Sequence, residues 1–209
     1  MNVITKLEIG KRNKERVNVY IDGEFAFSLH AEIIYKESLK VNDKVDLERL
    51  KKMAEEDNYL KCKNSAIRII ERSYKSEKEI REKLLLKEYE NKTIDRTLEF
   101  LKEYNLLNDE KLTSMYVKDR LRSEGKNKIK YSLIRKGISE DLIEEELSKV
   151  DDDNLRETAY NLGLKKYNTL LKRENDKYKL SQKLYRFLMS KGYGYDLISE
   201  VVKEIMKTE

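Results

Sequence analysis

The residues best suited to chemistry in this chain are lysines and arginines gathered in two stretches, and the chemistry they favour is anion binding. Residues 118–136 contain eight basic and two acidic residues, and residues 165–191 contain nine basic and two acidic residues. Between them, residues 139–157 contain nine acidic and two basic residues. The net charge of the whole chain is only +5, so the total understates this segregation. Rows of such cations suit a phosphate backbone or another extended acidic polymer.

Two interpretations of the basic stretches stay open. Any one lysine on a helix is more often a solvated group in a weak salt bridge than a binding residue. Recurrence of the basic stretches in step with the repeat described below favours binding for the set as a whole. The candidate binding residues are Arg120, Arg122, Lys126, Lys128, Lys130, Arg135, Lys136, Lys165, Lys166, Lys172, Arg173, Lys177, Lys179, Lys183, Arg186 and Lys191.

Tyrosines are interleaved with these basic residues, at Tyr74, Tyr131, Tyr178 and Tyr185. An aromatic ring beside cations can stack on a nucleic-acid base. A tyrosine on a helical face is more often a packing residue, and we prefer that interpretation for these four.

Motifs for catalysis or metal binding are not found in the sequence. The single histidine, His30, and the single cysteine, Cys62, form no zinc-binding cluster. His30 is predicted to cap or hydrogen-bond locally, and Cys62 is predicted to be inert. The run 151–153 of three aspartates lacks the glycine and distal glutamate of a calcium loop, so it is predicted to be a linker and helix N-cap. No glycine-rich phosphate loop or nucleophile elbow occurs, so we expect a non-enzymatic protein without a metal or cofactor.

The elements that carry these residues are predicted to be mainly helical. Among 209 residues, 41% are charged and 39% hydrophobic, with seven glycines and no proline, which favours long exposed helices. One cysteine allows no internal disulfide, no apolar run has the length of a membrane span, and the first residues lack the apolar core of a signal peptide. We therefore expect a cytoplasmic protein with no membrane partner, and a monomer.

Only the first 30 residues follow the period of a strand. Val3–Ile9, Val17–Ile21 and Phe25–Leu29 alternate apolar and polar residues, and Asp22-Gly23 is typical of a tight hairpin. A small three-stranded antiparallel sheet is expected, packed on the first helices. A short helix is predicted over residues 31–39. A second helix should begin at Leu47, with Asp46 as its N-cap, and continue past a break near Asp57.

After these elements, the sequence predicts three consecutive copies of a three-helix unit. Leading helices are predicted at about 59–73, 109–123 and 153–174. Each middle helix carries two apolar residues four apart, then Lys-Gly or Lys-Glu, then an apolar residue that folds back on the helix end. Glu88 replaces glycine in the first copy, so its cap should be strained or shaped differently. The three copies are Ile80, Leu84 and 87–89; Ile129, Leu133 and 136–138; Leu184, Leu188 and 191–193.

A repeat of about 50 residues is typical of a solenoid-like array. The chain is therefore expected to be mainly α, with a curved, elongated array of three helix-turn-helix-like repeats after the β element. The predicted domains are residues 1–57 (β element and short helices), 58–108 (first repeat), 109–151 (second repeat) and 152–209 (third repeat).

Taken together, these features resemble the RecX family of regulatory proteins. The hairpin Ile21–Phe27 is similar to the N-terminal extension of members from Gram-positive bacteria. The resemblance covers nearly the whole chain, and its specificity lies in the order and spacing of the pieces. The matching pieces are residues 73–81, 104–109, 116–117, 120–121, 134–139 and 186–193.

This resemblance implies tandem three-helix repeats that modulate, and mainly inhibit, the RecA recombinase. It implies binding along the groove of the RecA–single-stranded-DNA filament, which limits strand exchange, ATP turnover and the SOS coprotease activity. Some members bind DNA directly. The family supplies no catalytic residues, so the binding candidates above rest on charge and repeat position. Two other hypotheses stay open: a DNA-binding protein that acts by competing for single- or double-stranded DNA, and a helical scaffold without a nucleic-acid role.

Overall fold

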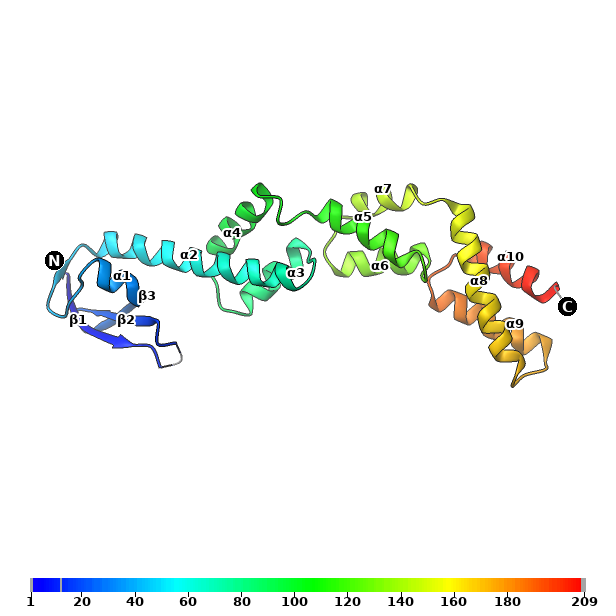
Figure 1. Cartoon of the computed structure of the whole chain (residues 1–209), viewed down its shortest axis with the longest axis horizontal. Coiled ribbons are helices and arrows are strands. Elements are labelled where there is room, and N and C mark those ends of the chain that lie inside the picture. Colours follow the sequence, from blue (N-terminus) through cyan, green and yellow to red (C-terminus); the bar gives the residue numbers. More distant parts are fainter. Residues whose placement is uncertain (1, 12, 208–209) are drawn as a thin grey trace. The chain divides into compact units, whose positions relative to one another are not determined.

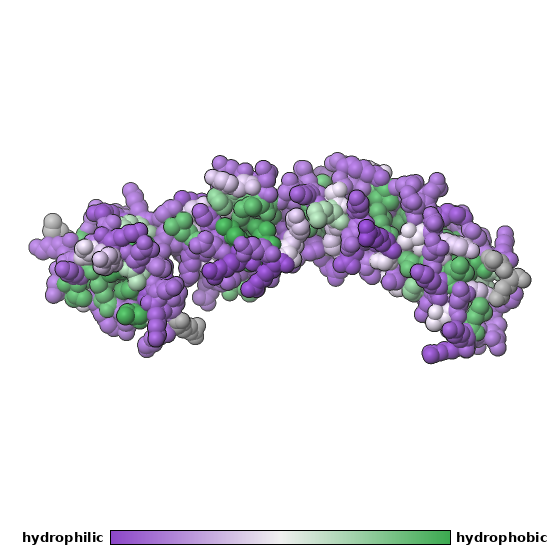
Figure 2. Space-filling view, in the orientation of Figure 1, coloured by the Kyte–Doolittle hydropathy of each residue, from purple (hydrophilic) through white to green (hydrophobic). Residues whose placement is uncertain are grey.

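The computed structural model describes residues 2–11 and 13–207, which divide into two units (Figure 1). The first unit comprises the described residues up to 73 together with 80–104, and the second comprises residues 74–79 and the described residues from 105 onward. Most of the surface visible in the space-filling view is hydrophilic, as the 41% of charged residues requires (Figure 2).

The first unit begins with an antiparallel sheet of order β3-β2-β1-β4. The three predicted strands are present as β1 (Asn2–Ile9), β2 (Arg16–Ile21) and β3 (Glu24–His30). The hairpin turn is confirmed, because Asp22 and Gly23 have φ values of 50° and 91°. The expectation of three strands is incomplete, since β4 (Lys44–Val45) pairs with the start of β1.

Two predicted N-caps of this unit are confirmed. His30 Nδ1 accepts a hydrogen bond of 3.3 Å from the backbone of Glu32 and caps α1 (Ala31–Lys36). The Asp46 carboxylate accepts hydrogen bonds from the backbone at the start of α2 (Leu47–Arg72). The predicted break near Asp57 is wrong, because α2 continues through it. Asp57 is instead buried and paired with the guanidinium of Arg16, which attaches the sheet to the helix.

Helices α3 (Glu77–Leu85) and α4 (Asn91–Glu103) complete the first repeat. The predicted apolar pair Ile80 and Leu84 is buried in it, and so are Ile94, Leu98 and Leu101 of α4. Cys62 of α2 is also buried, and burial raises the pKa of its thiol, although the Thr97 side chain partly opposes this shift.

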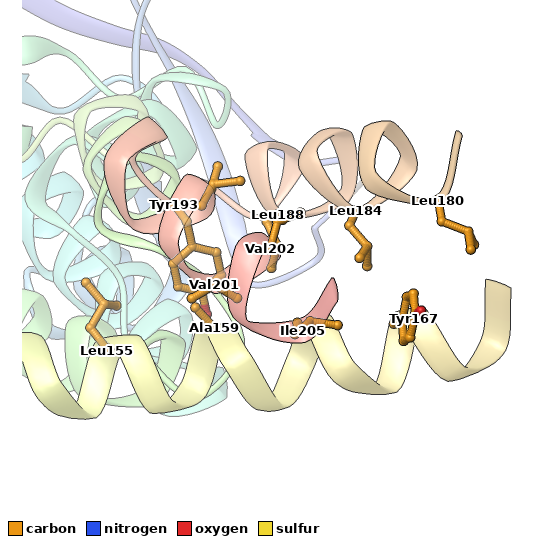
Figure 3. Close-up of a cluster of buried hydrophobic side chains, with 11 residues drawn as sticks. Leu155, Ala159, Tyr167, Leu180, Leu184, Leu188, Tyr193, Val201, Val202 and Ile205 are labelled. Carbon is orange, nitrogen blue, oxygen red and sulfur yellow. The ribbon is translucent and has the colours of Figure 1, made fainter. Parts of the chain in front are cut away.

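The second unit holds the remaining repeats. The second repeat consists of α5 (Asp109–Arg120), α6 (Lys126–Arg135) and α7 (Glu140–Ser148), and the third of α8 (Asp152–Leu171), α9 (Lys177–Ser190) and α10 (Tyr195–Lys207). Asp151 is the N-cap of α8, as predicted. Figure 3 shows how the third repeat closes: side chains of α8 and α9 face each other with those of α10 between them. Three-helix repeats are therefore the unit of this fold.

The predicted stop after each middle helix is confirmed in all three copies. Glu88, Gly137 and Gly192 have φ values of 64°, 83° and 87°. The residue that follows each of them is buried and donates its N–H to the carbonyl five residues earlier, as in a Schellman cap. Glu88 thus keeps the shape of the glycine cap in a backbone region that disfavours a side chain.

Within the second unit, the end of one middle helix meets the start of another. The Gly125 N–H donates to the carbonyl of Lys191 at 2.8 Å, and the Asn127 N–H donates to the carbonyl of Gly192 at 3.1 Å. The end of α6 meets segment 74–79 in the same way, where the buried Ser76 hydroxyl donates to the carbonyl of Lys136 at 2.5 Å. A Cβ added to Gly125, Gly137 or Gly192 would lie 2.5 Å or less from an atom across these joints, so the three positions have no room for a side chain.

The domain limits of the sequence analysis stay predictions. Helix α2 crosses residue 57, and the limits at 108 and 151 fall on the N-caps of α5 and α8.

Candidate functional site

The lysines of α6 are held by acidic side chains. Lys126 Nζ lies 2.7 Å from the carboxylate of Asp152, at the start of α8. Lys130 Nζ lies 2.8 Å from Glu144 and 3.6 Å from Glu140, both on α7. The hydrogen bond to Glu144 raises the pKa of Lys130 above its usual range. The acidic stretch therefore neutralises part of the basic stretch that precedes it.

Five further candidates also have acidic partners. Lys128 Nζ lies 3.0 Å from Glu124, and Lys136 Nζ lies 2.9 Å from Glu79. The local salt-bridge interpretation describes all of these side chains, which leaves them less charge for a ligand. The other three pairs are Arg120–Asp119 at 3.9 Å, Lys179–Asp176 at 3.8 Å and Lys183–Glu174 at 2.9 Å.

The remaining candidates make no ion pair with any residue of the described ranges. Most of them belong to the third repeat, along the second half of α8, the turn after it, and α9. The binding interpretation is therefore strongest in that repeat, because its cations keep their charge for a ligand. These residues are Arg122, Arg135, Lys165, Lys166, Lys172, Arg173, Lys177, Arg186 and Lys191.

Two of these unpaired lysines converge on one aromatic ring. Lys166 Nζ of α8 lies 5.5 Å from the ring centroid of Phe187, and Lys191 Nζ, at the end of α9, lies 5.7 Å from it. Both distances are within the range of a cation–π contact. The carboxylates of Glu200 and Glu204 of α10 form ion pairs with the guanidinium of Arg156, near the start of α8, at 2.7 and 2.5 Å.

The interpretation of the interleaved tyrosines as packing residues holds for one of the four. Tyr185 is half-buried against the core of the third repeat, and its ring centroid lies 6.1 Å from that of Tyr195. Tyr74, Tyr131 and Tyr178 are 59%, 67% and 71% exposed, so that interpretation is wrong for them.

A groove of about 360 Å³ lies between α5, α7 and α8. Its lining includes the apolar side chains of Val117 and Leu155, and also Lys118 and Arg122, which make no ion pair in the described chain. Lys118 is exposed and was not among the sequence candidates.

The other residue that the candidate set omits is Phe187. A signal for it exists in the sequence, because Phe187 and Lys191 are four residues apart and share a face of α9. The contribution of Lys166 has no such signal, since it comes from α8 and depends on how the two helices pack.

In residues 2–11 and 13–207, no group of three or more His, Cys, Asp or Glu side chains is placed to hold a metal ion. None of the helices in that part of the chain is both long and apolar enough to cross a membrane.

Comparison with known proteins gives the family of the chain. Residues 2–46 match the regulatory protein RecX N-terminal domain, and residues 62–101, 108–147 and 152–202 match the first, second and third RecX three-helix domains. A regulatory protein RecX of Clostridium perfringens is 54% identical over 209 residues, which is 100% of this chain and 99% of that protein. The chain belongs to the RecX family of regulatory proteins. A RecX of Clostridioides difficile is 38% identical over 99% of this chain and 97% of its own.

Solved structures of RecX proteins share the fold. One crystal structure of regulatory protein RecX has a TM-score of 0.67 and 24% identity, and covers 100% of both chains. RecX from Lactobacillus salivarius has a TM-score of 0.64 and 24% identity, and the match covers 71% of this chain and 97% of that one. The predicted fold class, mainly α with three-helix repeats after a small β element, is confirmed.

Proposed function

We propose that this protein modulates, and mainly inhibits, the RecA recombinase by binding the RecA–single-stranded-DNA filament. Binding would limit strand exchange, ATP hydrolysis and the SOS coprotease activity of the filament. The observation that carries the proposal is the match of all four RecX domains, in order, along the chain. The proposal includes a cytoplasmic, monomeric protein that is not an enzyme and uses no cofactor.

The charge of the repeats supports the proposal physically. A filament is a periodic, highly charged target, and tandem repeats present several weak contacts to it at once. Linked contacts bind far more tightly than each alone, because after the first contact the others form at high effective concentration. The nine candidate cations that have no ion-pair partner among the described residues can make such contacts without first breaking a salt bridge seen there.

A titration of ATP hydrolysis tests the proposal. Purified protein is added to RecA on single-stranded DNA, and the steady-state rate of ATP hydrolysis is followed. We expect the rate to fall at sub-stoichiometric ratios of this protein to RecA. Full ATP turnover in the presence of excess protein would contradict the proposal.

A second candidate function is a DNA-binding protein that affects RecA only by competing for DNA. The unpaired cations of the third repeat favour it. Adding the protein to preformed filaments, with and without excess free DNA, separates the two functions. Competition predicts that free DNA restores hydrolysis completely, whereas filament binding predicts inhibition that persists. Association with RecA in the absence of DNA would also count against competition.

A further inference from the structure

Lys166, Phe187 and Lys191 form a small cationic site on the face of α8 and α9. The two ammonium groups come from different helices and lie 5.5 and 5.7 Å from the centroid of the same ring. An aromatic face attracts a cation through its quadrupole, yet the ring carries no net charge. The ring therefore localises the two ammonium groups and leaves their positive charge uncompensated. A carboxylate in the same place would remove that charge.

The fold fixes the backbone of both lysines and the ring of Phe187. The carbonyl of Lys191 accepts a 2.8 Å hydrogen bond from the N–H of Gly125, which ties the end of α9 to the start of α6. Phe187 is half-buried and packs against the hydrophobic core of the third repeat, and Lys166 lies well inside α8. Binding groups held in place before the ligand arrives lose little entropy when they bind it.

Four acids of the third repeat are engaged elsewhere. Glu174 pairs with Lys183 at 2.9 Å, and Asp176 accepts backbone hydrogen bonds as the N-cap of α9. Glu200 and Glu204 share Arg156. No carboxylate of the described chain lies within ion-pair distance of Lys166 or Lys191, so the site keeps a net positive potential.

We propose that Lys166 and Lys191, positioned by Phe187, bind the phosphodiester backbone of a nucleic-acid strand. The proposal rests on the proposed function and names the part of the filament that the third repeat contacts, which is DNA. Ammonium groups bind phosphate as point charges, so recognition is independent of sequence. The lysines of α6 are not part of this site, because Glu124, Glu144 of α7 and Asp152 of α8 already pair with them.

The test compares two double variants of the full chain that lose the same charge. One is Lys166→Gln with Lys191→Gln, and the other, the matched control, is Lys126→Gln with Lys130→Gln. Binding to a fluorescein-labelled oligothymidine strand is measured by fluorescence anisotropy between 50 and 300 mM NaCl, without RecA. We expect the first variant to lose roughly tenfold in affinity at low salt and to reduce the log–log salt slope by about 1.4, because two phosphate contacts disappear. The control should lose less than about threefold.

A third variant, Phe187→Leu, tests the positioning role of the ring. Leucine keeps an apolar side chain against the core but cannot hold the ammonium groups. We expect the affinity to fall about threefold. Most of the salt slope should remain, because both lysine charges are retained. If Phe187→Leu both loses binding and has a lowered melting temperature, the loss could come from unfolding. The variant Phe187→Tyr then separates the two causes, because it keeps an aromatic face and should restore binding. The same oligonucleotide as a duplex shows whether the site takes single strands, double strands or both.

Equal losses in the two lysine variants would overturn the proposal, as would wild-type protein that fails to bind the naked strand at 50 mM NaCl. Unchanged DNA binding in Lys166→Gln with Lys191→Gln would also overturn it. If that variant at the same time loses inhibition of RecA, the third repeat contacts protein, and the proposed function stands. If wild-type protein binds DNA through this site but leaves ATP hydrolysis intact, the proposed function fails and the DNA site stands.

Discussion

At the scale of single residues, Glu88 occupies a backbone position that its counterparts fill with glycine. Its φ of 64° costs a residue with a side chain about 1 kcal/mol relative to glycine. Glu88→Gly should therefore raise the free energy of unfolding by about 0.5–1 kcal/mol, less than the full strain because glycine also loses more entropy on folding. Urea unfolding followed by circular dichroism measures the change.

Gly137→Ala is the matched control for that cap. Gly137 has a φ of 83°, and a Cβ there would lie 2.5 Å from the side chain of Lys78. We expect destabilisation by about 2 kcal/mol, from backbone strain together with the steric conflict. A stabilising Gly137→Ala, or a destabilising Glu88→Gly, would show that the cap geometry is not what limits stability here.

Tyr193 is the second residue with an unusual environment. It is 3% exposed, and its hydroxyl is buried without a hydrogen-bond partner in the described chain. Burial, with a smaller effect from the charge of Glu124, raises its pKa to about 12. Tyr193→Phe removes a polar group that gains nothing from burial, so it should raise the free energy of unfolding by about 1 kcal/mol at pH 7.

The pH dependence gives an independent check on Tyr193. Because its pKa is higher in the folded protein than the ordinary value near 10, the unfolded chain releases this proton first. The contribution to stability is therefore complete below pH 10 and is lost as the pH rises from 10 to 12. Thermal unfolding from pH 8 to 11.5 should show a shallower decline in Tyr193→Phe than in the wild type. Parallel curves for the two proteins would contradict the assignment.

At the scale of elements, the joint between α9 and α6 depends on a close approach of two backbones. A Cβ on Gly125 would lie 2.5 Å from the backbone nitrogen of Tyr193, and closer still to the carbonyl of Gly192. Gly125 has a φ of −85°, so alanine there is strained only by this contact. Gly125→Ala should destabilise the second unit by about 2–3 kcal/mol and speed hydrogen exchange at Asn127.

Gly194→Ala is the control for the joint. Gly194 precedes α10, and a Cβ added there would have no heavy atom within 4 Å from any described residue beyond its chain neighbours. Its replacement should cost less than about 1 kcal/mol, the usual difference between glycine and alanine before a helix. Similar losses in both variants would mean that the two glycines matter for backbone flexibility, not for the joint.

The ion pair between Arg16 and Asp57 attaches the sheet to α2. Their side chains are only 13% and 10% exposed, so either partner left alone is a buried, uncompensated charge. Asp57→Ala should destabilise the first unit by about 3 kcal/mol, measured by urea unfolding. The double variant Arg16→Met with Asp57→Leu should recover most of that loss, because it removes both charges. If the double variant recovers no stability, the loss in Asp57→Ala comes from packing and not from the uncompensated charge.

Elements whose signals are local could be predicted from the sequence. The stops at Gly137 and Gly192 are predictable because a left-handed residue must follow the helix, and glycine is the residue that adopts it most easily. The N-caps Asp46 and Asp151 and the turn at Gly23 follow from the same kind of local chemistry. The buried positions follow from the four-residue spacing repeated in each middle helix.

Features that depend on tertiary contacts could not be predicted in this way. Strand β4 has two residues and exists only because it pairs with β1. Asp57 looks like a helix breaker until Arg16, 41 residues away, is placed beside it. The candidate site divides into paired and unpaired lysines for the same reason, since Lys126 and Asp152 are 26 residues apart.

At the scale of the whole molecule, charge is sorted so that the repeats are not equivalent. In the second repeat, the three lysines of α6 all pair with acids, which lie on α7, at the start of α8 and just before α6. The third repeat keeps seven of its basic candidates unpaired within the described chain. We therefore expect the third repeat to set how tightly the protein binds the filament. Contacts from the other repeats should determine how far the bound protein inhibits ATP hydrolysis by the filament.

This division predicts how the variant Lys166→Gln with Lys191→Gln should inhibit RecA. Losing two phosphate contacts weakens one of several linked contacts, so the concentration for half-maximal inhibition of ATP hydrolysis should rise roughly tenfold. The residual rate at saturation should equal that of the wild type, because the remaining contacts are intact. The titration is run beside Lys126→Gln with Lys130→Gln, whose curve should stay within about threefold of the wild type. A raised residual rate with an unchanged midpoint would contradict the division, because the third repeat would then carry the inhibition itself.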